Sequence, residues 1–294
     1  MPPVSCPDAM VAVDLGGTRL RAAVFDAAGN ERFRAITPTP AADPAALAAA
    51  LVEARTAAER EGLQATRAVV GVPGWVDYRS NRTVTLPNLP AWGSIDGPAL
   101  SHATRLEVVF GNDADFAALG EHRHGAGRGV DDLVYVTCST GVGAGVVLRG
   151  RLVRSHRSIA EIGHSIIDRT TGETVEELAS GTALALRAGM PAEVVATRAA
   201  SGDPEAARLF HDAADALGIG VLNMVLLFGP ERVVIGGGMS GAGDLLLGPV
   251  RQRIEEGRSP LLGLRPEDVV LAELGQAVGL LGAFAYWEDE FAAG

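Results

Sequence analysis

The sequence predicts an α/β protein of two similarly built domains, each with a mostly parallel sheet covered by helices. Three observations lead to this prediction. The length of 294 residues is about twice that of a typical domain. Short apolar runs, which are typical of buried parallel strands, alternate with segments of helical periodicity. An order of strand, glycine turn and strand occurs near the start of the chain and begins again near residue 133.

The composition excludes several classes of protein. The 25 Lys and Arg against 36 Asp and Glu give a net charge of −11, which argues against nucleic acid as the main partner, because phosphate binding needs clustered cations. Two cysteines, Cys6 and Cys138, are too few for a disulfide framework or a four-cysteine zinc site. No apolar run approaches the roughly 20 residues of a membrane span, and the N-terminus lacks the basic region of a signal peptide. We therefore expect a soluble, cytoplasmic protein.

The first half of the chain is expected to begin with a β-hairpin and to continue as alternating helices and strands. A helix after the hairpin is indicated by Asp43 at a cap, Pro44 at the first helical position, and a shared apolar face of Leu47, Leu51 and Ala54. The expected elements are strands at 10–13 and 20–25, turns at 14–18 and 27–30, a helix from 44 to Gly62, strands at 68–72 and 108–110, and a helix over 114–121.

The second half repeats this organisation. The long helix expected there begins with the cap Asp203 and with Pro204, and Leu209, Ala213 and Leu217 share its apolar face. The expected elements are a strand at 133–137, a glycine-rich turn at 139–145, strands at 146–148, 233–235 and 269–271, and a closing helix over about 276–291.

Three glycine-rich turns follow apolar strands, and 37 of the 294 residues are glycine. The turns are Gly16-Gly17, Gly141–Gly145 and Gly236–Gly238. Glycine lets the backbone approach a ligand closely, so its N–H groups can cradle phosphate oxygens. Each turn alone has an ordinary structural explanation as well. None matches the P-loop, and none is a convincing dinucleotide fingerprint.

Two polar residues favour phosphate binding at these turns. Asp14 lies at a strand end beside the first turn, where a carboxylate can hold Mg²⁺ through water and Thr18 can meet a phosphate. Thr140 occupies the equivalent place in the second turn. One such hairpin in each of two domains predicts a nucleotide in the cleft between them.

Seven short segments carry a resemblance to a known family. They are Asp14-Leu15-Gly16-Gly17-Thr18, Pro73-Gly74-Trp75-Val76-Asp77, Asn88-Leu89-Pro90-Ala91-Trp92, Asn112-Asp113-Ala114, Thr140-Gly141-Val142-Gly143, Glu161-Ile162-Gly163-His164 and Gly236-Gly237-Gly238. In this order they resemble the ROK-family sugar kinases, which are similar to glucokinase and have the actin- and hexokinase-type ATPase fold. The resemblance runs over roughly residues 10–290. It implies two actin-like (ribonuclease-H-like) domains: an N-terminal lobe of residues 1–113 and 276–294, and a C-terminal lobe of residues 114–275.

The resemblance also implies a role for individual residues. Asp113 matches the catalytic base, which accepts the proton of the sugar hydroxyl as that hydroxyl attacks the γ-phosphoryl group. ATP and Mg²⁺ are the implied cofactors, with Asp14 as the magnesium residue through water. The implied sugar contacts are Gly74, Asn88, Asn112, Asp113, Glu161, His164 and Glu176. The implied phosphate and nucleotide contacts are Asp14, Gly16, Gly17, Thr18, Thr140, Gly141, Gly143, Gly237 and Gly238.

The chemistry of Asp113 is consistent with this role independently of the resemblance. Phosphoryl transfer depends mostly on positioning and charge stabilisation, with one carboxylate orienting the nucleophile. Asp113 follows a buried strand and stands next to a helix start, so it is expected at the carboxyl edge of a sheet. The pair Asn112-Asp113 can instead simply cap the helix, or Asn112 can cap it while Asp113 acts as the base.

Two segments depart from the family pattern. Residues 165–174 contain no cysteine where most members carry a cysteine zinc loop, so no structural zinc is expected, and His164 serves either a sugar hydroxyl or the structure. The residues before Glu161 lack three glycines of the family pattern and include the basic strip Arg149–Arg157. This strip is either a solvated surface hairpin or part of an altered acceptor pocket.

The expected function is an ATP- and Mg²⁺-dependent kinase of a primary hydroxyl on a hexose or hexose-like polyol, with glucose as the default acceptor. The alternatives are a modified sugar or a cyclitol as acceptor, polyphosphate as donor, and a non-catalytic sugar-sensing regulator. A repressor of this family needs an N-terminal DNA-binding segment, whereas only about ten residues precede the first strand. The partners implied are a small-molecule sugar and a second copy of the chain in a homodimer.

Overall fold

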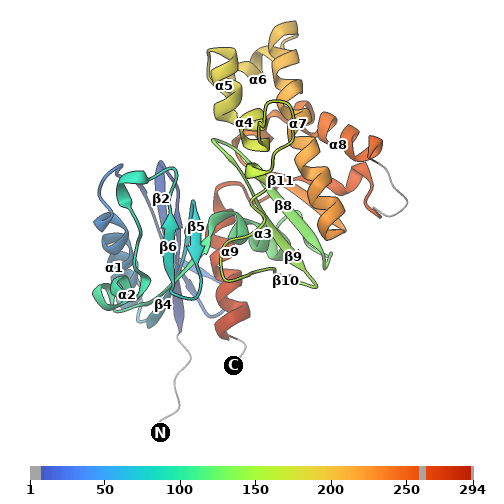
Figure 1. Ribbon diagram of the computed structural model, residues 1–294. Helices are drawn as coiled ribbons and strands as arrows, with labels where there is room; N and C mark the ends of the chain where they lie inside the picture. The colour runs from blue at the N-terminus through green and yellow to red at the C-terminus, as the bar shows by residue number, and fades with distance from the viewer. Residues whose placement is uncertain (1–7, 258–262, 293–294) are drawn as a thin grey trace. The chain divides into compact units, whose positions relative to one another are not determined.

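The computed structural model describes residues 8–257 and 263–292. The chain divides into two compact units (Figure 1). Unit 1 comprises residues 1–120, 154–159 and 276–294, and unit 2 comprises residues 121–153 and 160–275. The expected boundary between the lobes, after residue 113, lies at the start of the helix Asp113–His124. The boundary between the two compact units lies after Gly120, within the same helix.

Unit 1 is built on a five-stranded mixed sheet in the order β3-β2-β1-β4-β7. The first three strands pair antiparallel, and β4 and β7 continue the sheet parallel to β1. A two-stranded hairpin, β5–β6, lies outside this sheet. The strands are β1 (Ala9–Leu15), β2 (Arg19–Asp26), β3 (Glu31–Pro38), β4 (Ala65–Val72), β5 (Trp75–Asp77), β6 (Arg82–Thr85) and β7 (Glu107–Asn112).

Helices cover the unit 1 sheet by apolar packing and by close backbone contact. Leu47 and Leu51 of α1 are fully buried and belong to one core with Val11 and Val13 of β1. A Cβ atom on Gly282 of α9 would lie 1.7 Å from the carbonyl oxygen of Phe116 in α3, so only glycine permits this approach. The helical elements are α1 (Ala45–Arg60), η1 (Pro90–Trp92), α2 (Gly97–Thr104), α3 (Asp113–His124), α9 (Val278–Trp287) and η6 (Glu288–Ala292).

Unit 2 repeats the sheet of unit 1. Its strand order is β10-β9-β8-β11-β12, with the first three strands antiparallel and the last two parallel to β8. The predicted recurrence of the strand, turn, strand pattern is therefore confirmed. The strands are β8 (Leu133–Cys138), β9 (Val142–Leu148), β10 (Arg151–Leu152), β11 (Arg232–Gly236) and β12 (Val269–Leu271).

Two details of the sequence-based element bounds are wrong. Gly143 and Gly145 lie inside β9, so the second turn contains only residues 139–141. Val142, Ala144, Val146 and Val147 of β9 are buried, and the two glycines continue the strand between them. Pro44 is the N-cap of α1 and not its first helical residue. The closing helix expected over about 276–291 is confirmed, since α9 continues as the π-helix η6 to Ala292.

The helices of unit 2 surround its sheet, and the longest of them forms the core. Among the helices in the described ranges, α7 alone is long and apolar enough to cross a membrane by length and composition. Its residues Phe210, Leu217 and Val221 are buried in the core of unit 2, which explains its apolar composition. The helical elements are η2 (Ile162–His164), α4 (Val175–Ala179), α5 (Gly181–Ala188), α6 (Ala192–Ala200), α7 (Pro204–Phe228), η3 (Gly238–Ala242), α8 (Asp244–Glu256), η4 (Pro266–Asp268) and η5 (Gly275–Ala277).

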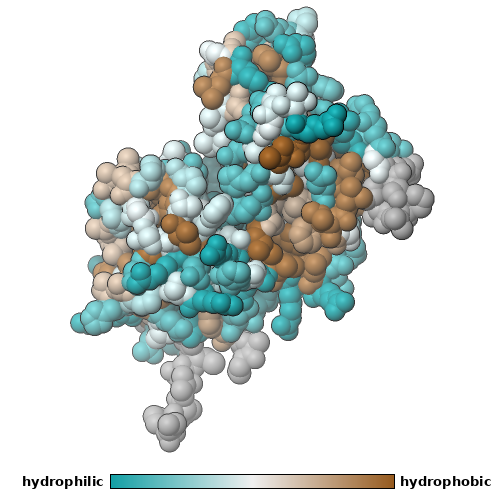
Figure 2. All heavy atoms as spheres, viewed as in Figure 1, coloured by the Kyte–Doolittle hydropathy of each residue, from teal (hydrophilic) through white to brown (hydrophobic). Residues whose placement is uncertain are grey.

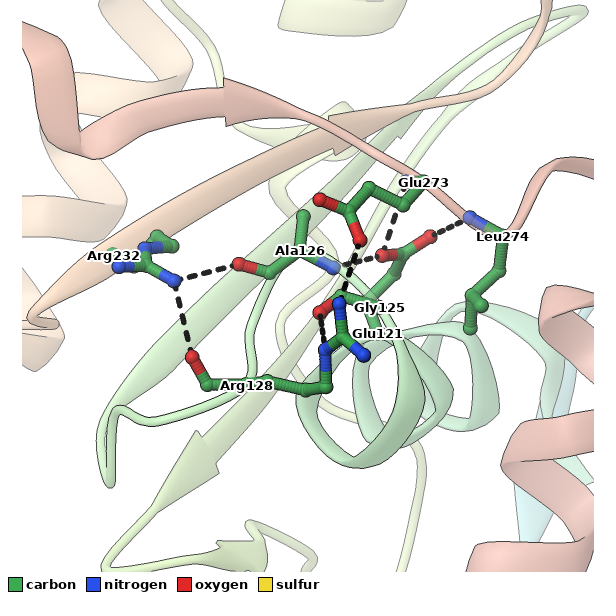
Figure 3. A network of polar contacts seen from close by, with 7 residues as sticks. All are labelled: Glu121, Gly125, Ala126, Arg128, Arg232, Glu273 and Leu274. Atoms are coloured by element: carbon green, nitrogen blue, oxygen red, sulfur yellow. Dashed lines mark hydrogen bonds and ion pairs between the residues drawn. The ribbon is translucent and has the colours of Figure 1, made fainter.

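A buried carboxylate ties together two segments of unit 2 that are far apart in sequence. Glu121 has no exposed surface, and Figure 3 shows its carboxylate at the centre of a polar network. It accepts hydrogen bonds from the backbone N–H groups of Ala126 at 2.8 Å, Glu273 at 3.2 Å and Leu274 at 2.9 Å. The end of α3 is thereby fastened to the segment that leads into α9.

Replacing Glu121 with Ala is expected to lower the free energy of unfolding by about 3 kcal/mol, because it leaves buried N–H groups without their charged acceptor. Thermal and denaturant unfolding measure this loss. Glu53→Ala is the matched control, since Glu53 is an exposed helical glutamate and its removal is expected to change stability by less than about 0.5 kcal/mol. Equal, small effects of both substitutions would contradict the structural role of Glu121.

Candidate functional site

The first glycine turn of unit 1 connects β1 to β2 and is braced by the end of β3. The N–H of Gly16 donates to the carbonyl of Arg19 at 2.9 Å, and the Thr39 hydroxyl donates to the carbonyl of Gly16 at 2.7 Å. A Cβ atom on Gly17 would lie 3.1 Å from the Cβ of Asn88. The turn, with the exposed Thr18, therefore lies beside Asn88.

Asp14 lies beside this turn and forms a partly buried ion pair with Arg21. Its Oδ2 forms an ion pair with Nη1 of Arg21 at 2.9 Å. Burial raises the pKa of Asp14, and the positive charge of Arg21 opposes that rise. A Cβ atom on Gly279 would lie 2.8 Å from Cγ of Asp14, so the start of α9 approaches the carboxylate closely.

Arg21 is a member of this group that the sequence analysis missed. Asp14 and Arg21 stand directly opposite each other in the register of the β1–β2 hairpin. Opposite charges at such positions attract each other across an antiparallel pair. The register of a hairpin centred on the glycine turn would therefore have been enough to predict that Asp14 and Arg21 are paired.

The turn between β7 and α3 holds three of the expected sugar-side residues together. Oδ1 of Asn112 accepts hydrogen bonds from the N–H groups of Ala114 at 2.9 Å and Asp115 at 3.2 Å, so Asn112 caps α3. Its Nδ2 donates to the carbonyl of Gly74 at 3.0 Å. Asp113 is the first residue of the helix, and its Oδ1 also accepts the N–H of Ala114 at 2.9 Å, so the two side chains share that donor while Asn112 alone accepts from Asp115.

Gly74 is fixed by its neighbours at this turn. A Cβ atom there would lie 2.1 Å from the carbonyl oxygen of Thr85. The position therefore accepts no side chain, and its carbonyl remains where Asn112 can reach it.

The second glycine turn, in unit 2, rests on Glu176. Oε2 of Glu176 accepts a hydrogen bond from the N–H of Val142 at 2.8 Å, and a Cβ atom on Gly141 would lie 2.4 Å from the same oxygen. A Cβ atom on Gly163 would lie 2.2 Å from the carbonyl oxygen of Val142. The turn that carries the exposed Thr140, the Glu176 carboxylate and the 161–164 segment thus lie together.

The segment of Glu161 and His164 forms the short helix η2. Glu161 is its N-cap residue, and the His164 side chain is exposed. The preceding residue, Ala160, has a φ of +60°, a left-handed conformation that favours glycine. The loss of the family's glycines is therefore accompanied by backbone strain just before Glu161.

A cavity of 580 Å³ opens beside the second glycine turn within unit 2. Its wall combines the turn, η3 and three helices, and most of it is apolar. It is lined by Ser139, Thr140, Gly181, Thr182, Ala185, Pro191, Ala192, Glu193, Ala196, Thr197, Phe210, Gly238, Met239, Gly241 and Ala242. The volume falls within the range of small-molecule and cofactor sites.

The cavity is lined by residues of the second and third glycine turns and by residues of two helices, α5 and α6, that were not predicted from the sequence. Gly238 lines it directly, and a Cβ atom on the adjacent Gly237 would lie 2.4 Å from the carbonyl oxygen of Cys138. The missed helices α5 and α6 supply Thr182 and Thr197. Their region did carry a usable pattern: Thr174 and Glu177 form a capping box at the start of α4.

The shorter segment at residues 165–175 is closed by hydrogen bonds. The N–H groups of Thr170 and Thr171 donate to Oδ1 of Asp168 at 2.7 and 3.2 Å, and the N–H of Val175 donates to the carbonyl of Ser165 at 2.9 Å. These bonds hold the hairpin that leads from His164 to Glu176.

Comparisons with known proteins identify the class of this fold and site. A ROK hexokinase structure from Thermus thermophilus is similar with 34% identity and a TM-score of 0.81, over 97% of this chain and 100% of that one. A ROK family glucokinase from Streptomyces griseus, solved with glucose and AMPPNP, is 28% identical with a TM-score of 0.77, over 97% and 100% of the two chains. The fold is thus that of the actin-like ATPases, as predicted, and the protein is a sugar kinase.

The sequence relatives give the same result and define the family. The sequence model of the ROK family matches residues 10–290, and the chain belongs to the ROK family. A glucokinase of Streptomyces coelicolor is 30% identical over 93% of this chain and 95% of its own length. An N-acetylmannosamine kinase of Shigella boydii is 31% identical over 93% and 96%. The resemblance to the ROK-family sugar kinases is therefore confirmed. The relatives differ, however, in the sugar for which they are named.

The buried thiol beneath the second turn is expected to be chemically inert. Burial, with a further contribution from the charge of Glu176, raises the pKa of Cys138 to about 12. A thiol with that pKa is about one ten-thousandth thiolate at pH 8, and the thiolate is the reactive form. In a Cys6→Ser variant, we expect the folded protein to react with a disulfide reagent at pH 8 at least a hundredfold more slowly than the unfolded protein. Similar rates in the two states would contradict the burial of Cys138.

Proposed function

We propose that this protein is an ATP-dependent kinase that phosphorylates a primary, 6-OH-type hydroxyl of a hexose, with glucose as the default acceptor. The observation that carries the proposal is the turn at the end of β7. There Asn112 caps α3 and binds Gly74, and Asp113 follows at the first helical position. A carboxylate held on a rigid helix start is suited to orient an attacking hydroxyl.

In the proposed mechanism Asp113 accepts the proton of the sugar hydroxyl as the hydroxyl oxygen bonds to the γ-phosphorus. The bond from that phosphorus to the β,γ-bridging oxygen breaks, and ADP leaves. In unit 1, Gly74, Asn88 and Asn112 are proposed to contact sugar hydroxyls, which both donate and accept hydrogen bonds. In unit 2, the residues proposed for sugar contacts are Glu161, His164 and Glu176.

The cavity of unit 2 favours a nucleotide over polyphosphate as donor. Its wall includes the apolar side chains of Pro191, Ala196, Phe210 and Met239. Polyphosphate has no apolar part to bury there, whereas a nucleoside has a base with two apolar faces. In this assignment Gly237 and Gly238 contact the adenosine, and Thr140, Gly141 and Gly143 contact the phosphates.

The first turn is proposed to serve the phosphates together with magnesium. Gly16, Gly17 and Thr18 would approach phosphate oxygens, and Asp14 would hold the hydrated ion through water. The ion would neutralise charge that develops on the phosphates. A buried carboxylate beside Arg21 fits this role, because an outer-sphere contact needs only one accepting oxygen. No structural zinc is proposed, since the 165–175 hairpin is closed by hydrogen bonds.

The acceptor is less closely defined than the donor, because the relatives are named for different sugars. A modified sugar or a cyclitol is the alternative acceptor. Ala160, which stands in a backbone conformation that favours glycine just before Glu161, is the observation that favours a modified pocket. A non-catalytic sugar-sensing role would require no base at the position of Asp113.

The N-terminal lobe is proposed to carry the sugar side and first phosphate loop, and the C-terminal lobe the second phosphate loop and the adenosine side.

A cytoplasmic homodimer is proposed as well. Leu226 and Leu227 near the end of α7 are 57% and 75% exposed. Figure 2 shows apolar side chains gathered on the visible face of unit 2, which supports an association surface there.

Replacing Asp113 with Asn is expected to lower kcat by about 10²- to 10⁴-fold, because the amide cannot accept the hydroxyl proton. Sugar binding is expected to persist within about threefold, since the amide keeps the shape and most hydrogen bonds. A coupled assay for ADP measures kcat, and calorimetry measures sugar affinity.

Asp244→Asn is the matched control for this substitution. Asp244 is also the first residue of a helix, α8, and is exposed and outside the proposed site. Its substitution is expected to leave kcat unchanged. Full activity of Asp113→Asn would rule out Asp113 as the base.

A further inference from the structure

The turn that carries Asp113 is contacted by the hydroxyl of a partly buried tyrosine, Tyr78. The hydroxyl of Tyr78 donates to Oδ2 of Asp115 at 3.0 Å, and the backbone N–H of Asn112 donates to the same hydroxyl over a longer distance of 3.4 Å. One hydroxyl group therefore contacts the residues on both sides of Asp113.

The partner of Tyr78 in the first turn of α3 is deeply buried. Asp115 is only 1% exposed, and its backbone N–H donates a hydrogen bond to Oδ1 of Asn112 in the helix cap. A buried carboxylate needs hydrogen-bond donors, since taking its charge out of water is costly. Tyr78 supplies one. Burial and the nearby charge of Asp115 raise the pKa of Tyr78 above its usual range, so the hydroxyl keeps its proton and remains a donor.

Tyr78 is in turn fixed by residues 154–158, the end of the basic strip together with Ser158, which belong to unit 1. The backbone N–H of Tyr78 donates to the carbonyl of His156 at 3.1 Å, and that of Val76 donates to the Ser158 hydroxyl at 3.1 Å. The Arg154 guanidinium lies 5.9 Å from the centre of the Tyr78 ring. The strip thus extends the β5 segment and holds the tyrosine from its backbone and its ring face.

Arg154 itself is anchored at the C-terminal end of unit 1. It lies 4.9 Å from the ring centre of Tyr286, donates to the Tyr286 hydroxyl, and binds Oε1 of Glu290 at 2.8 Å. These contacts fit neither of the two explanations given for the basic strip, a solvated hairpin or part of an acceptor pocket. Arg154 instead has a structural role inside unit 1.

We propose that the Tyr78 hydroxyl is a positioning group that fixes the Asn112–Asp113 turn, and with it the reacting carboxylate. The proposal rests on the proposed function, in which Asp113 is the base. Tyr78 acts through Asp115 and the backbone of Asn112. Loss of its hydroxyl frees the turn to shift, and small displacements of a reacting group lower rates strongly while substrate binding is kept.

The test is the variant Tyr78→Phe, which removes the hydroxyl and keeps the ring that packs under Arg154. We expect kcat to fall by about tenfold or more, with the KM values for sugar and ATP changed by less than about twofold. Tyr286→Phe is the matched control. It removes a hydroxyl from the same aromatic group, but that hydroxyl bonds to Arg154 and not to the Asn112–Asp115 turn. Its kcat is expected to stay within about twofold of the wild type.

A double variant and a stability measurement make the result decisive. Asp115→Asn combined with Tyr78→Phe is expected to be no slower than Tyr78→Phe alone by more than about twofold, because the hydroxyl that links Tyr78 to Asp115 is already absent from Tyr78→Phe. Melting temperatures of both tyrosine variants are measured in parallel. Equal losses of kcat in the two tyrosine variants, or unchanged kcat in Tyr78→Phe, would overturn the positioning role.

Asp113→Asn is assayed beside these variants to separate the two levels of the proposal. If Asp113→Asn retains activity, the base assignment is wrong and the positioning role falls with it. If Asp113→Asn is inactive while Tyr78→Phe matches the wild type, the base assignment stands and only the role of Tyr78 is rejected.

Discussion

The hydrogen bond from Asn112 to the carbonyl of Gly74 is the contact on which the turn between β7 and α3 depends. It joins the end of β7 to the segment after β4, and the same side chain caps α3 through its oxygen. The same turn places Asp113, the proposed base, at the first position of α3, where its Oδ1 also accepts the N–H of Ala114. Glycine at position 74 is required for the contact, because any side chain there would collide with Thr85.

Close backbone contacts at glycine recur in unit 2. Gly141 lets the Glu176 carboxylate approach the second turn, and Gly163 lets η2 approach the carbonyl of Val142, both at distances that exclude a side chain. The cavity beside the turn is then completed by apolar residues such as Phe210 and Met239. Close packing and internal hydrogen bonds therefore hold the second turn in one conformation, so little ordering of this turn would be left to the binding of a ligand.

Much of this structure could be predicted from the sequence, for physical reasons. The apolar runs at β1, β4 and β8 fix buried strands, and the repeated hairpin fixes two sheets of one topology. The turn of the proposed base could be predicted because Asn112 and Asp113 follow an apolar run directly. The cavity could not, because α5 and α6 are short, and their cavity-lining residues are brought beside η3 and the second turn only by tertiary packing. Tyr78 and Asp115 escaped notice because their contact joins residues 37 positions apart and depends on tertiary packing.

The measurement that tests the account most directly is product analysis of the wild-type enzyme by phosphorus NMR. The enzyme is incubated with Mg²⁺, each of about a dozen hexoses, aminosugars and cyclitols, and either ATP or polyphosphate. The account predicts a phosphomonoester at the primary hydroxyl of a hexose, formed with ATP and at least about tenfold more slowly with polyphosphate. Absence of any sugar phosphate with either donor would contradict the account, as would a product made from polyphosphate alone.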